Sequence, residues 1–378
     1  MGLHILVLAG GGGTRLWPLS RKATPKHLLP LGPGGKTLLR ASVERVFDLG
    51  DTVSVVTAAT QAEGCAQVLH GLVGSDGIIA EPDARGTGPA LGLATALLRR
   101  RDPDALIASL HADAEVGDDA AYRAAVAASA GWALATNGLA TVGLRPTWPS
   151  SGMGYIEVGA KLEDADWRPL RQLPGPVAAA AAALPAFRAI RMVEKPGAAD
   201  AAAYHQAGTH LWNLGLFAWP AATFLDELER ADPSVAAAVD RTAAARLAGD
   251  EPAAAEAYSS VKPAAVEPLV LETTSRLSVV EAAFPWSDLG SWGDLHAARV
   301  AAGEADAEDN VLAGDALAIG ARGCTIEARG GRLVVVAGAD GLVVVDTPDA
   351  LLVVPQSEAQ RVKEVVERLR QAGRTELL

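Results

Sequence analysis

The segment from residue 6 to residue 26 constrains the fold more than any other stretch of this chain. It reads LVLAGGGGTRLWPLSRKATPK, and it continues a short apolar run that starts at His4. Apolar runs of this length that end at glycine are typical of buried strands in parallel sheets. The run ends at Ala9 and is followed by four consecutive glycines, Gly10 to Gly13. The sequence therefore predicts a buried strand that opens into a glycine loop.

The glycine loop has the properties of a phosphate-binding site. Because glycine has no Cβ, the backbone N–H groups of residues 10–14 can turn toward one point and approach an anion closely. Formal positive charge follows at Arg15, Arg21 and Lys26. Together these features suit a triphosphate. The predicted loop contacts are Gly10, Gly11, Gly13 and Thr14.

Two common phosphate loops do not fit this segment. A P-loop ends in Gly-Lys-Ser/Thr, whereas Gly13 is followed by Thr-Arg. An NAD-type Rossmann fingerprint needs a third glycine at the start of a helix and an acidic residue about 20 residues later. Neither pattern is present in this segment, so a dinucleotide-binding enzyme is not favoured.

Apolar segments alternate with helical ones through most of the chain. Strands separated by helices of ten or more residues indicate a doubly wound α/β sheet, mixed but mostly parallel and Rossmann-like. Ligands of such sheets bind at the carboxyl ends of the strands, where the glycine loop lies. The Pro/Ala segment 163–186, which includes the alanine run 178–183, is interpreted as a surface excursion without a chemical role. Strands are predicted at 53–57, 77–80, 105–110, 140–144, 190–193, 216–219 and 277–281, and helices at 37–47, 60–72, 88–101 and 119–136.

The composition changes at residues 303–309, whose sequence GEADAED is typical of a linker. We therefore predict a catalytic domain over 1–302 and a smaller domain over 310–378. Short apolar runs punctuated by glycine or proline favour a β-helix or a small sandwich in the second domain. An amphipathic helix over 358–371 closes it. The apolar strands of this domain are compatible with a homodimer.

Charge and cysteine content narrow the classes of partner. The formal net charge is −12, and no basic stripe interrupts it. Binding to nucleic acid or to an anionic membrane surface is therefore not expected. No apolar run reaches the roughly 18 residues of a membrane span, and no signal peptide is recognisable. The two cysteines, Cys65 and Cys324, lack the spacing of a zinc site, which fits a cytoplasmic protein.

The glycine-loop segment also carries a family resemblance. Its G-G-x-G-T-R-L-W-P-L-S-R, with Pro25-Lys26 following, resembles the sugar-nucleotide pyrophosphorylases and specifically the mannose-1-phosphate guanylyltransferases. Residues 344–352, VVDTPDALL, resemble the C-terminal part of the same family, which forms a left-handed β-helix. The resemblance implies transfer of GMP from GTP to mannose 1-phosphate, giving GDP-mannose and pyrophosphate. Some members append an isomerase domain, whereas this chain is expected to be a transferase alone.

The resemblance implies a Mg²⁺ site formed by two aspartates. Asp113 directly follows the predicted strand 105–110, where the family has P-A-D-H, and Asp288 lies in WSDLGSW, where the family has W-S-D-V-G-S-W. Mg²⁺ takes one or two carboxylates and completes its shell with phosphate oxygens and water. His111 replaces the family's proline and is left without a role.

A second motif is expected to contact the nucleotide. Residues 81–90 read EPDARGTGPA, where the family has E-P-x-x-R-N-T-A-P-A. Glu81 could accept hydrogen bonds from guanine N1–H and the exocyclic amine. Gly86 and Gly88 replace asparagine and alanine, which leaves the base preference open. The residues assigned to the nucleotide are Glu81, Pro82, Arg85 and Thr87.

Further motifs are expected to bind the sugar phosphate. Glu194 could accept two sugar hydroxyls and Lys195 could neutralise the sugar phosphate. Residues 266–273, VEPLVLET, depart from the family's I-D-Y-A-I-M-E-K, although both acidic positions, Glu267 and Glu272, are kept. The sugar therefore stays open at this point. The residues assigned to the sugar phosphate are Gly154, Glu194, Lys195 and Asn213.

The expected mechanism needs no general base, because a phosphate monoester is already largely dianionic at pH 7. Catalysis is then positioning and charge neutralisation by Arg15, Lys26 and the metal site at Asp113. Two alternatives remain: the same chemistry with a heptose or glucose 1-phosphate or another nucleoside triphosphate, and a non-catalytic regulator that binds a sugar nucleotide. Retention of all the charged groups argues against the regulator.

Overall fold

The computed structural model describes residues 2–11, 13–171 and 173–378, and Gly12 of the glycine loop lies outside them. The chain forms two compact units. Unit 1 comprises Met1–Ala9, Ser42–Ala112 and Asp118–Phe284, and unit 2 comprises Gly10–Ala41, Asp113–Gly117 and Pro285–Leu378. The division into folding domains at 302 and 310 stays a prediction.

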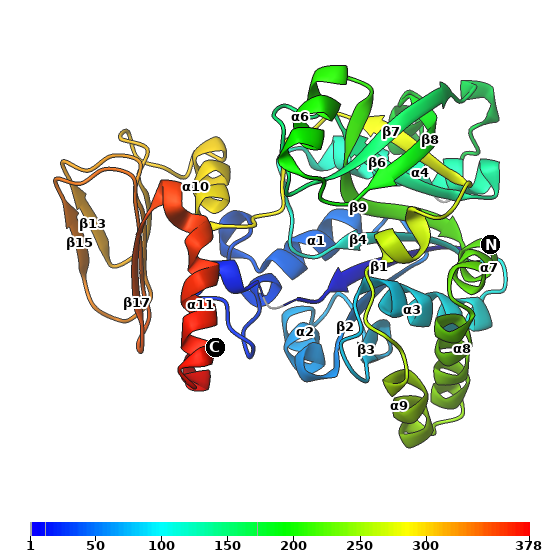
Figure 1. Ribbon diagram of the computed structural model, residues 1–378, viewed down its shortest axis with the longest axis horizontal. Helices are drawn as coiled ribbons and strands as arrows, with labels where there is room; N and C mark the ends of the chain where they lie inside the picture. The colour runs from blue at the N-terminus through cyan, green and yellow to red at the C-terminus, as the bar shows by residue number, and fades with distance from the viewer. Residues whose placement is uncertain (1, 12, 172) are drawn as a thin grey trace. The chain divides into compact units, whose positions relative to one another are not determined.

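Unit 1 is built on a nine-stranded mixed sheet with the order β3-β2-β1-β4-β9-β6-β10-β8-β7 (Figure 1). The strand β7 was not predicted, because its sequence GYIEVGAK alternates only weakly. The strands are β1 (Leu3–Ala9), β2 (Thr52–Ala58), β3 (Ile78–Glu81), β4 (Leu106–His111), β6 (Leu139–Leu144), β7 (Gly154–Lys161), β8 (Ala186–Val193), β9 (His210–Pro220) and β10 (Leu277–Ala282).

The sheet has a parallel part and an antiparallel part. Strands β3, β2, β1 and β4 pair in parallel, and so do β6 and β10. Strand β9 runs antiparallel to β4, β6 and β7, and β8 runs antiparallel to β7 and β10. All seven residues of β1 are buried, as expected of a central strand covered on both faces. The mixed α/β sheet is therefore confirmed.

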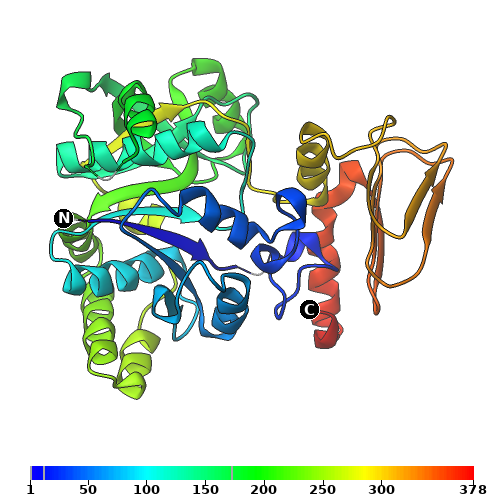
Figure 2. The ribbon, with the colours of Figure 1, turned by 180° about the vertical axis from the view of Figure 1, so that it is seen from behind.

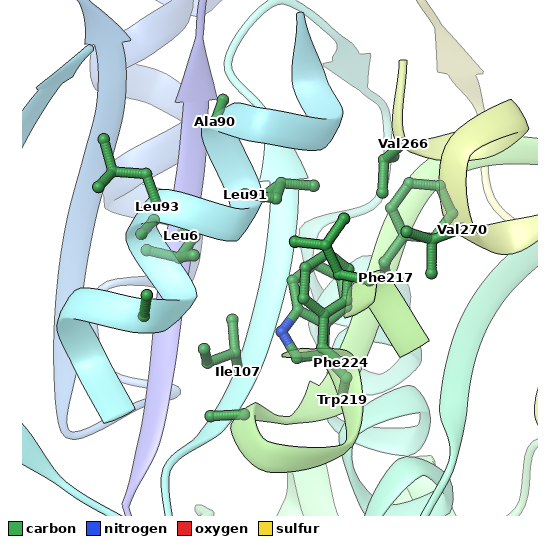
Figure 3. Packing of buried hydrophobic residues seen from close by; sticks show 14 of the residues in the cluster. Leu6, Ala90, Leu91, Leu93, Ile107, Phe217, Trp219, Phe224, Val266 and Val270 are labelled. Carbon is green, nitrogen blue, oxygen red and sulfur yellow. The ribbon is translucent and has the colours of Figure 1, made fainter. Parts of the chain in front are cut away.

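Helices of unit 1 pack on the sheet around one large apolar cluster. Leu91, Phe217 and Trp219 are fully or almost fully buried in it, and Val266 and Val270 approach it from a later segment (Figure 3). The bounds are α1 (Leu38–Val46, which begins in unit 2), α2 (Ala62–Val68), α3 (Thr87–Arg101), α4 (Asp119–Thr136), α5 (Gly175–Ala182), α6 (Ala198–Ala207), α7 (Ala221–Ala231), α8 (Pro233–Leu247) and α9 (Glu251–Ser259).

The segment 163–186 is more ordered than its sequence indicated. Residues Gly175–Ala182 form the helix α5, which packs against α4 and buries Ala181. A run of alanines favours a helix because alanine loses no side-chain entropy when the helix forms. The run therefore forms a helix that the sequence interpretation did not include, although most of its residues are exposed, as expected of a surface segment.

Unit 2 contains the predicted β-helix-like region. A four-stranded sheet has the order β12-β14-β16-β17, and β13 pairs with β15. These strands are coloured orange to brown in Figure 2. All pairings except β16–β17 are parallel. Cys324, Ile326 and Val344 fill the interior between these strands. The strands are β12 (Val311–Gly314), β13 (Ala316–Ile319), β14 (Thr325–Ala328), β15 (Val334–Ala337), β16 (Leu342–Asp346) and β17 (Leu351–Pro355).

The predicted closing helix is confirmed as α11 (Val362–Gln371), preceded by a 3₁₀ segment, Gln356–Arg361. A further helix, α10 (Trp292–Ala301), and a two-stranded ribbon of β5 (Glu115–Val116) and β11 (Trp286–Ser287) complete unit 2. None of the helices formed by the described residues is both long enough and apolar enough to span a membrane.

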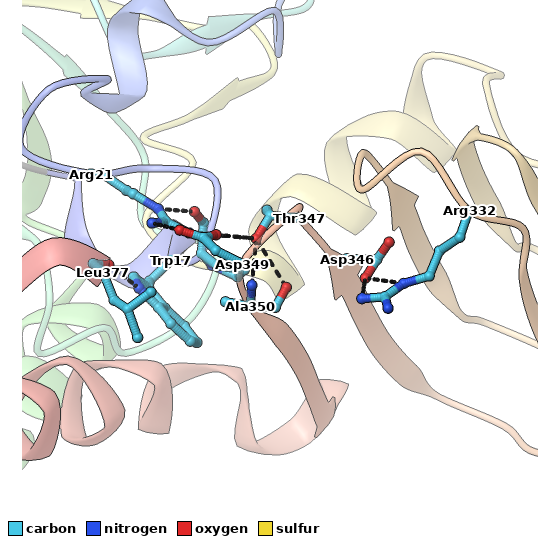
Figure 4. A network of polar contacts seen from close by, with 9 residues as sticks. Trp17, Arg21, Arg332, Asp346, Thr347, Asp349, Ala350 and Leu377 are labelled. Carbon is cyan, nitrogen blue, oxygen red and sulfur yellow. Dashed lines mark hydrogen bonds and ion pairs between the residues drawn. The ribbon is translucent and has the colours of Figure 1, made fainter. Parts of the chain in front are cut away.

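The signature segment packs against the C-terminal part of the chain within unit 2. Leu16 and Trp17 share an apolar cluster with Trp292 and with residues of β16 and α11. The Trp17 indole N–H donates to the carbonyl of Leu377 at 2.7 Å, as Figure 4 shows, and the Trp292 indole N–H donates to the carbonyl of Trp17 at 3.1 Å. Part of the signature is therefore structural.

Candidate active site

The glycine loop follows β1 and leaves its backbone accessible. Gly10 and Gly11 are exposed, and a Cβ added to either would meet no atom within 4 Å. Gly11 has a φ of +95°, which only glycine adopts readily. Gly13 is restricted to glycine for another reason: a Cβ added there would lie only 2.5 Å from the Cβ of Lys26. The loop thus exposes amides at its start and packs against Lys26 at its end.

Lys26 links the two aspartates that were predicted to bind metal. Its side chain is 7% exposed, and its Nζ atom lies 2.9 Å from Oδ2 of Asp113. The same ammonium group donates to the main-chain carbonyl of Asp288 at 2.5 Å. The Asp113 carboxyl is partly exposed and Asp288 is exposed. One buried ammonium group therefore contacts both the carboxylate of Asp113 and the main-chain carbonyl of Asp288.

A strained turn directs Asp288 toward Lys26. Leu289 is fully buried and has a φ of +45°, a conformation that costs a leucine on the order of 1–3 kcal/mol. Its carbonyl lies 3.5 Å from the Lys26 Nζ atom. The Gly290 N–H donates to Oδ1 of Asp288 at 3.1 Å, which orients the carboxylate. Strain of this kind is kept where the surrounding structure fixes a geometry, and here it serves the contact with Lys26.

His27 belongs to the same cluster and was missed from the sequence. It is 1% exposed, and burial lowers its pKa to about 4, although the nearby Asp113 carboxylate opposes that shift. The imidazole is therefore neutral at pH 7 and adds no charge beside Lys26 and Asp113. In the sequence, only its position directly after Lys26 indicated that His27 lies in this cluster.

The three basic residues of the signature have different environments. Thr14 and Arg15 are exposed on a short 3₁₀ turn, Thr14–Leu16, that directly follows the glycine loop. The Arg21 guanidinium instead binds Asp349 through two bonds of 2.6 and 2.7 Å (Figure 4). The expectation that Arg21 places its charge beside the loop is therefore not met, and Arg21 holds the C-terminal segment.

Unit 1 brings together the residues assigned to the sugar phosphate. A Cβ on Gly154 would lie 2.5 Å from Oε2 of Glu194 and 3.2 Å from Cβ of Asn213, so the three residues share one corner of the sheet. The Lys195 Nζ atom lies 2.5 Å from Oε1 of Glu194. Lys195 has a φ of +47°, a second unusual backbone conformation inside a signature motif.

Two further acidic residues lie near Glu194, and His111 interacts with one of them, Glu267. Oε1 of Glu272 accepts the Glu194 backbone N–H at 3.0 Å. Burial raises the pKa of Glu267, and the nearby Glu194 carboxylate acts in the same direction, whereas His111 and Lys195 oppose it. His111 also packs against Gly215, whose Cβ would lie 2.6 Å from the imidazole Cδ2. His111 and Glu267 are thus part of this corner, although neither was assigned a role from the sequence.

The predicted nucleotide motif lies in unit 1, at the end of β3. Glu81 is 8% exposed, and its Oε2 accepts a hydrogen bond of 2.6 Å from the Tyr258 hydroxyl. Burial raises the pKa of Glu81 to about 7, although the Tyr258 bond opposes that shift. Pro82 is partly buried, and the Arg85 guanidinium pairs with Asp83 at 2.8 Å. Glu81 therefore has an internal partner, and its assignment to guanine stays a prediction.

Among the described residues, no group of three or more His, Cys, Asp or Glu side chains is arranged to hold a metal ion. The two predicted ligands, Asp113 and Asp288, carry carboxylates, which are hard oxygen ligands; Lys26 contacts the first through its carboxylate and the second through its main-chain carbonyl. This set fits Mg²⁺, which binds proteins through one or two carboxylates and takes its other ligands from phosphates and water. It does not fit Zn²⁺ as a structural ion, which needs four protein ligands.

Two protein families match the chain. Residues 4–304 match the family described as Nucleotidyl transferase, and residues 314–369 match the MannoseP isomerase/GMP-like beta-helix domain. The chain is 34% identical to the mannose-1-phosphate guanylyltransferase of Escherichia coli K12 over 387 residues, which cover 99% of this chain and 75% of that protein. It is 34% identical to the xanthan biosynthesis protein XanB of Xanthomonas campestris pv. campestris, with 98% and 74% covered.

A solved structure is similar over almost the whole chain. It is described as a mannose-1-phosphate geranyltransferase from Thermus thermophilus, and it superimposes with a TM-score of 0.79 at 33% identity. The match covers 98% of this chain and all of that one. Both units therefore have their counterparts in a single known chain.

Proposed function

The chain belongs to the nucleotidyl transferase family, a family of enzymes, and from that premise we propose that it transfers GMP from GTP to mannose 1-phosphate, releasing pyrophosphate. The observation that carries the proposal is the Lys26 cluster, in which one buried ammonium group contacts both Asp113 and Asp288. The choice of GTP and mannose 1-phosphate is supported by the relatives that share a third of their residues with this chain over nearly its whole length.

The reaction requires two polyanions to approach each other. The sugar phosphate is largely dianionic at neutral pH and attacks the α-phosphate without a general base. We assign to the exposed amides of Gly10 and Gly11, together with Arg15, the binding of the triphosphate. Lys26 is held in place by its packing against Gly13 and by its contact with Asp113, so this part of the site is preorganised.

We further propose that Asp113 and Asp288 hold Mg²⁺. When bound, the ion supplies positive charge to the phosphate oxygens. Lys26 then has two roles in the chain itself: it orients the Asp113 carboxylate through the 2.9 Å contact, and it fixes the turn at Asp288 through the main-chain carbonyl. Both are positioning roles, which agree with catalysis by preorganisation.

The acceptor is assigned to the corner formed by Gly154, Glu194 and Asn213. Glu194 presents a carboxylate to sugar hydroxyls, and Lys195, which is 64% exposed and paired with Glu194, carries a positive charge for the sugar phosphate. Asn213 is held by its Oδ1, which accepts the Gly215 N–H at 3.2 Å. This corner supports a hexose 1-phosphate as the acceptor.

The proposal is tested by pyrophosphate release with Mg²⁺ across four nucleoside triphosphates and the 1-phosphates of mannose, glucose and a heptose. Turnover confined to GTP with mannose 1-phosphate is the expected result. Turnover with another pair would keep the chemistry and change the substrates. Absence of turnover across the whole matrix, with tight binding of GDP-mannose, would replace the enzyme by a sugar-nucleotide-binding regulator.

A further inference from the structure

Three of the positions at which the chain departs from the family pattern lie on two sides of one backbone contact in unit 1. Gly86 directly precedes α3 and Gly88 lies in the first turn of that helix, and Pro268 stands in the segment that follows α9. A Cβ on Gly86 would overlap the carbonyl oxygen of Ala264. A Cβ on Gly88 would lie 2.7 Å from Cδ2 of Leu269, which is adjacent to Pro268. The two glycines therefore leave the space that this later segment fills.

Backbone hydrogen bonds join the two segments directly. The Ala264 N–H donates to the carbonyl of Arg85 at 2.9 Å, and the Gly88 N–H donates to the carbonyl of Ala264 at 3.0 Å. The Val266 N–H donates to Oγ1 of Thr87 at 2.9 Å. The buried bond from Tyr258 to Glu81 adds a fourth link at the base of the same contact.

The joined segment carries the acidic residues of the sugar-phosphate corner. Residues Glu267–Leu271 form a single turn of π-helix that begins directly after Val266, and Glu272 follows it. Val266 and Val270 anchor this turn in the apolar core, as Figure 3 shows. Both ends of this turn lie near Glu194: Glu267 interacts electrostatically with the Glu194 carboxylate, and Glu272 accepts the Glu194 N–H. Turns of π-helix occur frequently at functional sites.

We propose that Gly86, Thr87 and Gly88 are positioning residues, which fix the backbone of residues 264–266 and so set where Glu267 and Glu272 stand against Glu194. The loop assigned to the nucleotide thereby determines the geometry that the sugar phosphate meets. This inference rests on the proposed function for its kinetic consequence, whereas the contact itself is independent of it.

Gly86→Ala is the direct test. Gly86 has φ +85° and ψ 172°, a region essentially confined to glycine, so the variant is strained and also loses the room for Ala264. Gly71→Ala is the matched control, because Gly71 has a φ of +82° and its Cβ would meet nothing within 4 Å. We expect Gly86→Ala to raise KM for mannose 1-phosphate about five- to tenfold, the scale of one lost hydrogen bond, with KM for GTP nearly unchanged. Gly71→Ala should change neither KM.

A pair of variants at residue 87 tests the same contact without adding a clash. Thr87→Val removes the oxygen that accepts the Val266 N–H, whereas Thr87→Ser keeps it. We expect the valine variant to raise KM for the sugar phosphate and the serine variant to restore it. A rise in KM for GTP alone would assign Thr87 to the nucleotide and overturn the proposal.

Amide hydrogen exchange separates this inference from the proposed function. The Ala264 and Val266 amides should exchange faster in Gly86→Ala than in the wild type and should be unaffected in Gly71→Ala. If the wild type shows no turnover with GTP and mannose 1-phosphate, the proposed function fails. The exchange rates still test whether residues 86–88 hold the backbone of residues 264–266. Unchanged exchange in a folded Gly86→Ala protein would overturn the inference.

Discussion

The ammonium group of Lys26 lies 2.9 Å from Oδ2 of Asp113, and the Cβ of the same lysine closes against the backbone of Gly13. The end of the glycine loop and the aspartate that follows β4 are thus joined through one side chain. Lysine serves this purpose because its long apolar stem packs while its charged end reaches the carboxylate.

Lys26→Met should separate these two roles. The methionine keeps an apolar stem against Gly13, but Asp113 and the Asp288 carbonyl lose their shared cation. We expect turnover to fall by about 10², the scale of losing one preorganised electrostatic group, and stability to fall as well, because Asp113 and the turn at Asp288 lose a buried partner. Steady-state kinetics and a urea titration measure the two quantities. Turnover close to that of the wild type would remove Lys26 from the mechanism.

Arg15 and Arg21 should differ in what their removal costs. Arg15→Ala is expected to lower turnover by about 10² or more while leaving unfolding unchanged, because Arg15 is exposed beside the glycine loop. Arg21→Ala should leave turnover near wild type and lower stability by about 1 kcal/mol or less, since its ion pair with Asp349 is half-exposed.

The same kinetic assay and urea titration applied to both arginine variants check this contrast. The Arg21 guanidinium also lowers the pKa of Asp349, so the stability difference between Arg21→Ala and wild type should shrink when Asp349 is protonated in acid. A large loss of turnover in Arg21→Ala with unchanged stability would return Arg21 to the phosphate site.

Glu81→Gln should change how stability depends on pH. The folded state raises the pKa of Glu81 from 4.5 to about 7, so it retains a proton that the unfolded chain releases. The stability that protonated Glu81 contributes, about 3 kcal/mol, is therefore fully present below pH 4.5 and is lost as the pH rises toward 7. The glutamine keeps an oxygen for the Tyr258 hydroxyl and does not titrate, so its stability should lack this decrease.

Urea unfolding at pH 5 and pH 8 measures the effect for wild type and Glu81→Gln. Glu256→Gln, at an exposed position of α9, is the control and should follow the wild type at both pH values. Parallel pH profiles for wild type and Glu81→Gln would mean that Glu81 titrates in the folded protein as it does in the unfolded chain.

Gly154→Ala should affect the sugar phosphate selectively. The new Cβ would lie 2.5 Å from Oε2 of Glu194, so the carboxylate must move from its present position. We expect KM for the sugar 1-phosphate to rise about tenfold and KM for the nucleotide to stay unchanged. Gly152→Ala is a suitable control, since its Cβ would meet only Oγ of Ser150, at 3.6 Å. An equal rise of both KM values would show that this corner is not specific to the sugar.

The sequence was sufficient to predict those helices, strands and loops that depend on patterns among neighbouring residues. The strand that ends at Ala9, the glycine loop and the helices α3 and α4 were predicted within a residue or two, because apolar periodicity and glycine act on neighbouring residues. The aspartates at 113 and 288 were assigned because Asp113 follows a recognisable strand and Asp288 lies inside a recognisable motif, and their role as metal ligands stays a prediction. The helices α7 to α9 were not predicted: α8 and α9 are alanine-rich and show little periodicity, whereas α7 is amphipathic and its pattern was missed.

The tertiary structure decided which of these residues act together. Arg21 was assigned to phosphate until Asp349, 328 positions later, proved to be its partner. Glu81 and Tyr258 are 177 positions apart, and only the packing of α9 brings them together. The sequence by itself determined the strand, the loop and the residue types of the site. The fold determined their partners, because an ion pair or a buried hydrogen bond depends on distances that no local pattern encodes.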